Sequence, residues 1–581
     1  MATNCKTESG SCMSSGIQRD RQLLTDARKK GPLAVLSAYT KLSGPGWLQS
    51  AITLGGGSLS SSLYLGVLVG FSLMWLQPLA MILGIIMLSA IAYVTLSTGE
   101  RPFRAINQHV NPVLGWGWLI ASMMANLVWS LPQFALATAA IQQNLLKDTV
   151  GTEALPEPWG KVIVGAAILI VCIVVVFFYN TGGRGVKLFR VIIKLMVGLI
   201  VVCFFGVVIK MSVEGVLDWS RVLRGLVPNL RLLVSPAKTF TPFIAAVNSH
   251  CQAFWTNLIV AQQRDVMISA ASTAVGINMT FLLPYSMLRR GWNKQFRGLA
   301  IFDLSAGLFI PFVLATGCVV IASAAQFHTR PAVGFLGETD ANQVVVQPAQ
   351  NLIGKYKRIA AARVEYEIGS DAFAGLEKEE KARHIEALPI ADKRMAAMLV
   401  KRDAFNLAQS LSPLTGEVTA HYVFGIGVVG MAISSIIILM LINGFVVCEM
   451  FGVDSKGWPH RLGCLAPCIG VLGPFIWTGG KAQFWLAVPT SVFAMVLLPI
   501  AYFTFYLLMN QKSLLGDNMP RGSKRIAWNL LMAIAAGLAA FGSVWTLWSK
   551  LRWLGIGIIV VFVTLVLFVH VVRKAKQSTS N

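Results

Sequence analysis

Residues 44–66, GPGWLQSAITLGGGSLSSSLYLG, constrain the fold of this chain more than any other stretch. They open a mostly apolar run long enough to cross a bilayer, yet Gly55, Gly56 and Gly57 lie in its middle. Each glycine destabilises a helix by about 1 kcal/mol relative to alanine. Within lipid, backbone groups freed by an unwound turn must be buried in protein or line a cavity. The stretch predicts a broken membrane helix beside a polar cavity; the alternative is a continuous helix whose glycines allow close packing.

The composition of the whole chain is that of a membrane protein. Of its 581 residues, 55% are hydrophobic and 13% are charged, and the mean hydropathy is +0.65. Soluble domains carry about 25% charged residues. We therefore expect an all-α polytopic protein of the lipid bilayer. The net charge of +23 is explained by Lys and Arg in cytoplasmic loops, so no nucleic-acid partner is expected. The nine cysteines lie mostly in apolar spans, and no cofactor is expected.

Twelve membrane spans are predicted from the apolar runs. They cover residues 45–69, 72–97, 114–145, 161–180, 188–212, 265–288, 298–325, 420–449, 461–478, 482–509, 525–548 and 551–572. With the N-terminus inside, the basic loops and the basic C-terminal tail all fall on the inner side. We expect a multi-pass protein of a bacterial inner (plasma) membrane with both termini in the cytoplasm.

The spans divide the chain into five predicted parts. These are a cytoplasmic tail at 1–43, a first repeat of five helices at 44–212, an outer connection at 213–264, a second repeat at 265–509, and a helix pair with a basic tail at 510–581. The outer connection ends in an apolar piece that either re-enters the membrane or lengthens the sixth helix.

The second repeat contains the one sizeable soluble stretch, residues 330–419, whose acids and bases balance. Runs rich in Ala, Glu and Lys predict helices at about 350–366, 374–387 and 391–409, with Pro389 separating the last two. This insertion is interpreted as a lid, as a surface for a partner protein, or as a loop insertion without a function.

A second break is predicted in the sixth span, where Gly276 and Asn278 lie in the middle and Pro284 follows two turns later. Paired interruptions in corresponding helices of two halves are typical of the binding site of a secondary transporter. The cargo would be a small solute or an ion. No His–carboxylate cluster, nucleophile triad or phosphate loop stands at a suitable depth, so an enzyme is not expected.

The sequence resembles the Nramp (natural resistance-associated macrophage protein) family in several segments. Residues 44–66 resemble the first helix of the family, and residues 296–328, 425–452 and 493–517 resemble helices seven, eight and ten. RGLVPNL at 224–230 resembles the loop before helix six. The resemblance implies a LeuT-type (amino acid–polyamine–organocation) fold with a five-plus-five inverted repeat, and proton-coupled transport of divalent metal ions.

The same resemblance places differences at the metal site. The Asp-Pro-Gly-Asn motif of the family's helix one aligns with Gly55, Gly56, Gly57 and Ser58, and the Met-Pro-His motif of helix six aligns with residues 276–278. The proton-relaying acids of helix three align with about Pro132 and Ala135. The alignment therefore predicts loss of the carboxylate, amide, thioether and imidazole ligands, and of the proton relay. A proton-coupled Mn²⁺ or Fe²⁺ carrier is not expected.

Three interpretations of the site remain open. In the first, a metal ion such as Mg²⁺ keeps its waters and is held by Ser58, Asn278 and the carbonyls of Leu54 and Gly55. In the second, the Gly57 and Ser58 amides bind a small organic or anionic, amino-acid-like solute at a helix N-terminus. In the third, the protein is a non-transporting scaffold or receptor. The residues expected around the break are Leu54, Gly55, Gly57, Ser58, Gly276 and Asn278, with Asn126, Gln133, Tyr285, Ser434, Ser435 and Gln483 as secondary candidates.

Overall fold

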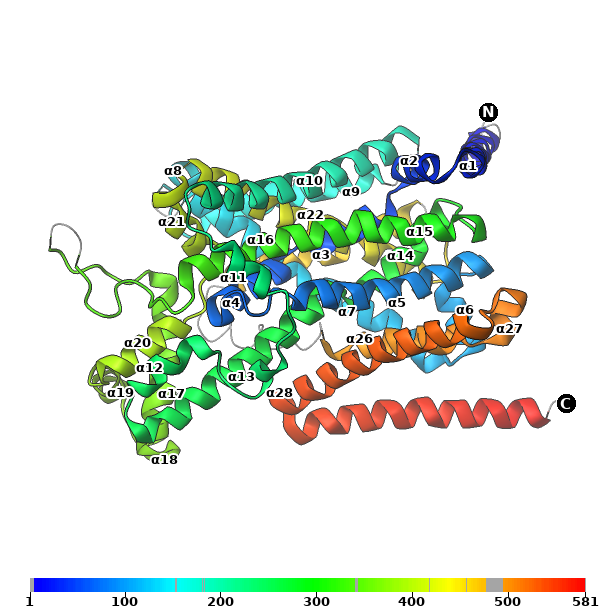
Figure 1. The fold of residues 1–581 in the computed structure, drawn as a ribbon. Coiled ribbons are helices and arrows are strands. Elements are labelled where there is room, and N and C mark those ends of the chain that lie inside the picture. The colour runs from blue at the N-terminus through cyan, green and yellow to red at the C-terminus, as the bar shows by residue number, and fades with distance from the viewer. Residues whose placement is uncertain are drawn as a thin grey trace.

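The computed structural model describes residues 5–151, 154–179, 181, 183–339, 343–416, 418–455, 457–476 and 495–579. Within these residues the regular elements are helices, apart from an isolated β-bridge between Thr339 and Val345. The long helices form a bundle, and both chain termini lie at one end of it, here called the terminal end (Figure 1). Shorter helices of the insertion lie at the opposite end, here called the cap end (Figure 1).

The bundle contains two series of helices in chain order. The first series is α3 (Pro45–Thr53), α4 (Gly56–Val69), α5 (Leu76–Thr98), α7 (Pro112–Ala140), α9 (Trp159–Phe178) and α10 (Gly183–Val213). The second series is α13 (Ser249–Ala274), α14 (Ile277–Arg289), α15 (Arg297–Leu304), α16 (Ile310–Phe327), α22 (Phe424–Met450) and α26 (Leu498–Met509). Helices α1 (Cys5–Lys30) and α2 (Pro32–Leu42) precede them, and α6 (Pro102–His109) links α5 to α7.

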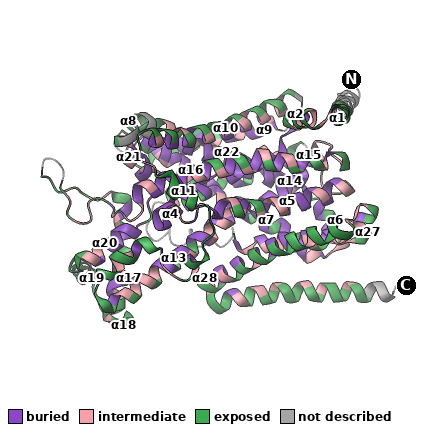
Figure 2. Ribbon diagram, viewed as in Figure 1, coloured by how far each residue is buried: buried purple, intermediate pink, exposed green. Residues whose placement is uncertain are grey.

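Most of the predicted spans are present. Eight helical segments of the described chain are long and apolar enough to cross a membrane, and α3 with α4 form a further candidate bent by 55°. The C-terminal helix α28 (Gly522–Thr579) reverses at Arg552, where φ is 51°, so it supplies two antiparallel arms (Figure 1). The apolar side chains of these arms are largely exposed, as expected for a surface that faces lipid (Figure 2).

The prediction of one continuous helix at 461–478 is wrong for the part that is described. This region consists of α23 (Trp458–Leu465), a 3₁₀ segment over Ala466–Leu472 and α24 (Gly473–Ile476). Pro467 and Pro474 remove two backbone donors. Gly470 packs closely on α7, because a Cβ there would lie 2.6 Å from Ser130 Oγ. Residues 477–494, which include most of the first half of the predicted span 482–509, lie outside the described residues.

Helix α22 forms the centre of the bundle. Nearly all of its residues are buried (Figure 2), and it packs against α3, α7, α10 and α23. Its polar residues Ser434, Ser435 and Asn443 are therefore enclosed, and they must find hydrogen-bond partners within the protein.

The connection before the sixth span is shorter than the sequence suggested. Of the two alternatives for its apolar piece, the structure has the longer helix, because α13 begins at Ser249 and runs without interruption to Ala274. The preceding residues form α11 (Trp219–Arg224), two 3₁₀ turns and α12 (Thr241–Ala245).

The insertion forms five helices, where two or three were predicted. They are α17 (Gln350–Ile368), α18 (Ser370–Gly375), α19 (Lys378–Glu386), α20 (Ile390–Leu399) and α21 (Ala404–Thr415). Pro389 precedes α20 as predicted. The predicted helix 391–409 is interrupted because Asp403 caps α21, accepting hydrogen bonds from the Phe405 and Asn406 amides at 3.1 Å each.

Buried polar contacts fasten the insertion to the bundle. Trp255 of α13 donates its indole hydrogen to Asp392 at 2.7 Å, and Arg363 pairs with the same carboxylate at 2.8 Å. The side chains of Arg363 and Asp392 are only 2% and 1% exposed.

Two neighbouring bases extend this attachment to α16 and α4. Arg402 donates to the Arg330 carbonyl at 2.7 Å and lies over the Phe327 ring at the end of α16. Burial lowers its pKa to about 10. The Lys401 ammonium lies 4.6 Å from the ring centroid of Tyr64 on α4, and burial lowers its pKa. The insertion is thus a packed cap that contacts α4, α13 and α16.

Removing the shared carboxylate should loosen the cap. We expect Asp392→Ala to destabilise it by about 2–4 kcal/mol, because Arg363 would lose its buried partner and keep only the largely exposed carboxylate of Glu367, at 2.8 Å. Limited proteolysis between residues 330 and 416, together with the thermal unfolding midpoint, measures this. Asp371→Ala, at an exposed position on α18, is the matched control. Equal cleavage rates for the two variants would contradict the assignment.

Candidate functional site

The first break lies between α3 and α4, at Leu54 and Gly55. Leu54 has φ −78° and ψ 69°, Gly55 is extended with φ −125° and ψ −177°, and α4 begins at Gly56. The glycines allow close packing here, because a Cβ on Gly55 would lie 2.5 Å from Ser435 Oγ and one on Gly56 would lie 2.9 Å from Leu136. A Cβ on Gly57 would meet only Thr273, at an ordinary 3.4 Å.

Side chains of α7 and α22 satisfy much of the backbone freed by this break. The Gly56 amide donates to Gln133 Oε1 at 2.9 Å. Ser434 and Ser435 donate to the Ala51 carbonyl at 3.0 and 3.3 Å. The structure therefore places these three secondary candidates directly against the break.

Ser58 spans the break itself. Its hydroxyl donates to the Thr53 carbonyl, the last residue of α3, and lies 3.5 Å from the Thr273 carbonyl of α13. The carbonyl of Gly55 accepts from the Leu59 amide at 3.0 Å and so belongs to the first turn of α4. Of the two carbonyls expected to hold a cation, that of Gly55 is thus already engaged.

The second break lies between α13 and α14. Val275 and Gly276 are extended, and α14 begins at Ile277. Gly276 is packed so closely that a Cβ would lie 2.6 Å from the Trp129 ring and 2.7 Å from Asn278 Oδ1. Both predicted breaks are therefore present, and α14 packs against α3.

A thioether lies between the two breaks, which corrects the prediction that the site has no sulfur donor. Met279 Sδ accepts hydrogen bonds from Thr53 Oγ1 at 3.1 Å and from the Gly276 amide at 3.3 Å. The helix-six motif of the family was aligned with residues 276–278, so Met279 lay just outside the aligned positions. Its signal in the sequence was the methionine directly after Asn278.

Three asparagines form a hydrogen-bonded series from the second break into the centre of the bundle. Asn278 donates to Asn126 Oδ1 at 3.1 Å, and Asn126 donates to Asn443 Oδ1 at 3.2 Å. All three are fully buried. Sequence reasoning named Asn278 and Asn126 but missed Asn443, a lone amide in an apolar part of α22.

Two buried amide oxygens beside the breaks have no hydrogen-bond donor. They are Gln49 Oε1 on α3 and Asn278 Oδ1 on α14, both on side chains that are 0% exposed. Gln49 Nε2 donates to the Met279 carbonyl at 3.2 Å, so this side chain also reaches from α3 to α14. A buried acceptor without a donor costs about 1–3 kcal/mol.

The acids of the neighbouring helices are engaged elsewhere. Asp303 accepts from the Gly44 and Gly46 amides at 3.0 and 2.7 Å and so caps α3 at the terminal end. Glu449 pairs with Arg101 at 3.2 Å. In the described part of the chain, no group of three or more His, Cys, Asp or Glu side chains could hold a metal ion.

Two secondary candidates are not among the side chains found at the breaks. Tyr285 lies two turns along α14, where its hydroxyl accepts from the Phe103 amide at 3.4 Å. Gln483 lies outside the described residues.

A polar surface links the first break to the cap end. Gly57 and Ser60 are exposed although they belong to the first turns of α4. Ser61 Oγ lies 2.9 Å from Ser269 Oγ of α13, and Tyr64 donates to Gln262 at 2.7 Å. Because α4 and α13 meet through hydroxyl and amide groups, this contact can be hydrated without a large penalty.

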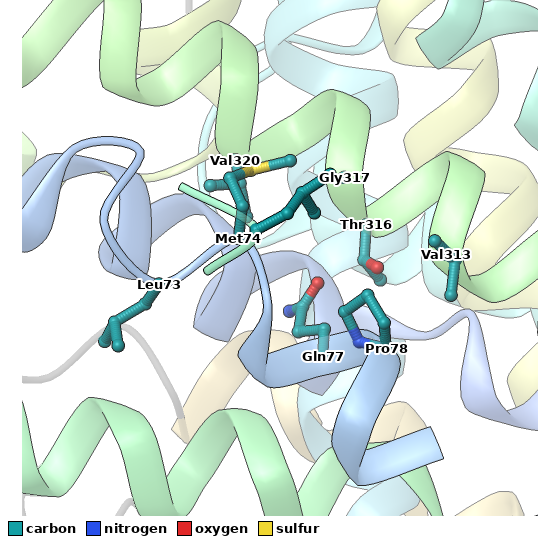
Figure 3. A pocket seen from close by; sticks show the side chains of 9 residues that line it. Leu73, Met74, Gln77, Pro78, Val313, Thr316, Gly317 and Val320 are labelled. Carbon is teal, nitrogen blue, oxygen red and sulfur yellow. The ribbon is translucent and has the colours of Figure 1, made fainter. Parts of the chain in front are cut away.

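A small cavity lies between α16, the start of α5 and the residues that precede it. It has a volume of about 40 Å³ and is lined by Gln77, Thr316 and mostly apolar neighbours (Figure 3). Gln77 donates to Ser62 Oγ at 2.6 Å, and Ser62 donates to the Ser58 carbonyl at 2.6 Å. A hydrogen-bonded series thus connects this cavity to Ser58.

A helical bundle with two interrupted spans that pack against each other is the arrangement typical of LeuT-type secondary transporters. Residues 46–356 and 393–549 match the family model "Natural resistance-associated macrophage protein-like". The chain belongs to the Nramp family, whose members are transporters. Residues 357–392, between the two matched segments, lie in the cap.

Solved structures give the same fold. A manganese transporter from Eremococcus coleocola, in complex with an aromatic bis-isothiourea compound, is 14% identical with a TM-score of 0.59, covering 93% of this chain and 96% of the other. A histidine-to-alanine variant and a glutamate-to-alanine variant of that transporter are each 13% identical with a TM-score of 0.59, covering 92% and 95%. No curated protein sequence matches this chain.

The close approach at Gly55 can be tested against Gly57. We expect Gly55→Ala to destabilise the protein by about 1–3 kcal/mol through overpacking against Ser435. Gly57→Ala should stay within about 1 kcal/mol, because its Cβ has room and alanine favours the helix. Thermal unfolding in detergent measures both. Equal effects of the two substitutions would show that Gly55 is not constrained by packing.

Proposed function

We propose that this chain is a metal-ion transporter whose cargo is a hard divalent cation of the Mg²⁺ kind, bound with part of its water shell. The observation that carries the proposal is the pair of donor-free amide oxygens, Gln49 Oε1 and Asn278 Oδ1, on the two broken spans. The waters around a hydrated cation can donate hydrogen bonds to these two oxygens. Hard divalent cations also prefer oxygen ligands.

The neutrality of the site argues against a transition metal. Carboxylate, imidazole and thiolate donors are missing from the described break, and the thioether of Met279 already accepts two hydrogen bonds. A buried charge without compensation costs several kcal/mol. Mg²⁺ sheds its waters reluctantly, so a site that binds through water requires fewer charged ligands.

The same composition argues against proton coupling through α7. A proton relay requires a titratable group in the cavity. The polar groups of α7 near the breaks are Asn126 and Gln133, and both are held in amide hydrogen bonds. Asp303 and Glu449 are engaged in a helix cap and an ion pair.

A second candidate is a small organic anion, and the exposure of Gly57 favours it. The N-terminus of α4 opens there toward the polar surface, and helix N-termini attract carboxylates. Against it, Gln133 already accepts from the Gly56 amide.

We also propose the orientation of the chain. It is an integral multi-pass membrane protein, and the loops at the terminal end are rich in Lys and Arg. By the positive-inside rule this end is cytoplasmic, and the cap is on the outer side of a bacterial inner membrane.

Uptake into liposomes tests the cargo. We expect the purified protein to carry Mg²⁺, and Asn278→Ala to reduce uptake about tenfold, the equivalent of one hydrogen bond to a charged group. Ser58→Ala should also reduce uptake, whereas Ser60→Ala, at an exposed hydroxyl two residues on, is the control. Amino-acid uptake that is insensitive to divalent ions would favour the organic solute instead.

The absence of a proton relay makes a separate prediction. Mg²⁺ uptake should proceed without acidification of the liposome lumen, as followed with a trapped pH indicator. Gln133→Glu would place a carboxyl group at the α4 N-terminus, so uptake should become pH-dependent between about pH 4 and 7. Gln143→Glu, at an exposed position of the same helical segment, should have no such effect. Lumen acidification by the unaltered protein would refute the prediction.

A further inference from the structure

The outer face of α10 carries an apolar groove that the transport site does not use. It has a volume of about 450 Å³ and is lined by Val191, Lys194, Leu195, Gly198, Leu199 and Val202. Gly198 leaves the groove open, because a Cβ there would have no neighbour within 4 Å. Leu195 and Val202 are 66% and 68% exposed, so this face lies against lipid in a membrane.

A line of basic residues leads to this groove from the terminal end. Arg184, Lys187, Arg190 and Lys194 recur every three or four residues and so share one side of α10. They extend over about 15 Å of helix, at 1.5 Å per residue. In the described residues none of the four forms a salt bridge.

Lys194 connects this face with the first half of the broken span. Its ammonium group donates to the Ser43 carbonyl at 3.3 Å and lies 5.6 Å from the ring centroid of Trp47 on α3. It occupies the point where the line of bases meets the groove. A ligand that contacts Lys194 from the lipid side therefore lies next to the start of α3.

We propose that this face of α10 binds an anionic phospholipid. The phosphate lies on Arg184, Lys187 and Arg190, and one acyl chain fills the groove at Gly198. Charge complementarity selects an anionic headgroup, because basic residues near the membrane surface attract anionic lipid by about 1 kcal/mol each. The adjoining apolar groove selects a lipid over a soluble anion. Through Lys194, the bound lipid stabilises the position of α3 against α10.

Binding to the intact protein tests this proposal independently of transport. Native mass spectrometry of the full chain, titrated with 1-palmitoyl-2-oleoyl phosphatidylglycerol or with the matching phosphatidylcholine, measures retained lipid. We expect at least about fivefold higher occupancy by phosphatidylglycerol, a difference of about 1 kcal/mol. Arg184→Gln, Lys187→Gln and Arg190→Gln combined should abolish this preference, and Gly198→Leu should lower occupancy by filling the groove.

Two controls distinguish the site from general effects. Arg521→Gln, Lys524→Gln and Lys574→Gln combined remove the same charge from exposed positions outside α10 and should leave the preference unchanged. Gly206 also has open space beside it on α10, but it does not line the groove. The Gly206→Leu variant should therefore bind lipid as the unaltered protein does. Three outcomes would overturn the proposal: equal retention of the two lipids, an equal loss of the preference in the control triple variant, or full displacement of the lipid by inorganic phosphate. So would unchanged binding in Gly198→Leu.

Discussion

The need to satisfy backbone groups away from water is the constraint on which the centre of this protein depends. Two membrane helices are interrupted, and each interruption frees carbonyl and amide groups that lipid cannot satisfy. Gln133, Ser434 and Ser435 provide much of the compensation at the first break, from helices that are themselves continuous. The interruptions are therefore stable only beside α7 and α22. Of the described segments that are long and apolar enough to cross a membrane, the one that contains α22 is the most buried.

The sequence predicted the fold where the physical signal was local. The glycine triplet and the apolar runs located the first break and most spans, because three consecutive glycines weaken a membrane helix whatever packs around them. The second break was harder to recognise, since a single glycine is common in such helices. The 3₁₀ segment over Ala466–Leu472 was not predicted, because the contact of Gly470 with Ser130 is made by residues far apart in the chain.

The site was predictable in composition but not in detail. Neutral polar residues around the breaks were expected, and Asn126, Gln133, Ser434 and Ser435 do lie there. Met279 was missed because the motif was aligned with residues 276–278, and the side chain that faces α3 after a helix break depends on the geometry of the turn. Gln49 and Asn443 were missed because polar residues within apolar spans most often bond only to a neighbouring helix. Their arrangement follows from tertiary packing alone.

The hydrogen bonds of the three asparagines all run in the same direction. Asn278 and Asn126 each give a hydrogen to the next amide, so the series ends in an oxygen at the break and in the Asn443 amino group at the other end. Turning one amide over would set two oxygens or two amino groups against each other, so the three must reverse together. In the observed orientation, Asn278 presents an oxygen, a hydrogen-bond acceptor, at the second break. In the reversed orientation it would present its amino group, a hydrogen-bond donor. One concerted rotation of three uncharged side chains thus decides whether the second break presents a hydrogen-bond acceptor or a donor.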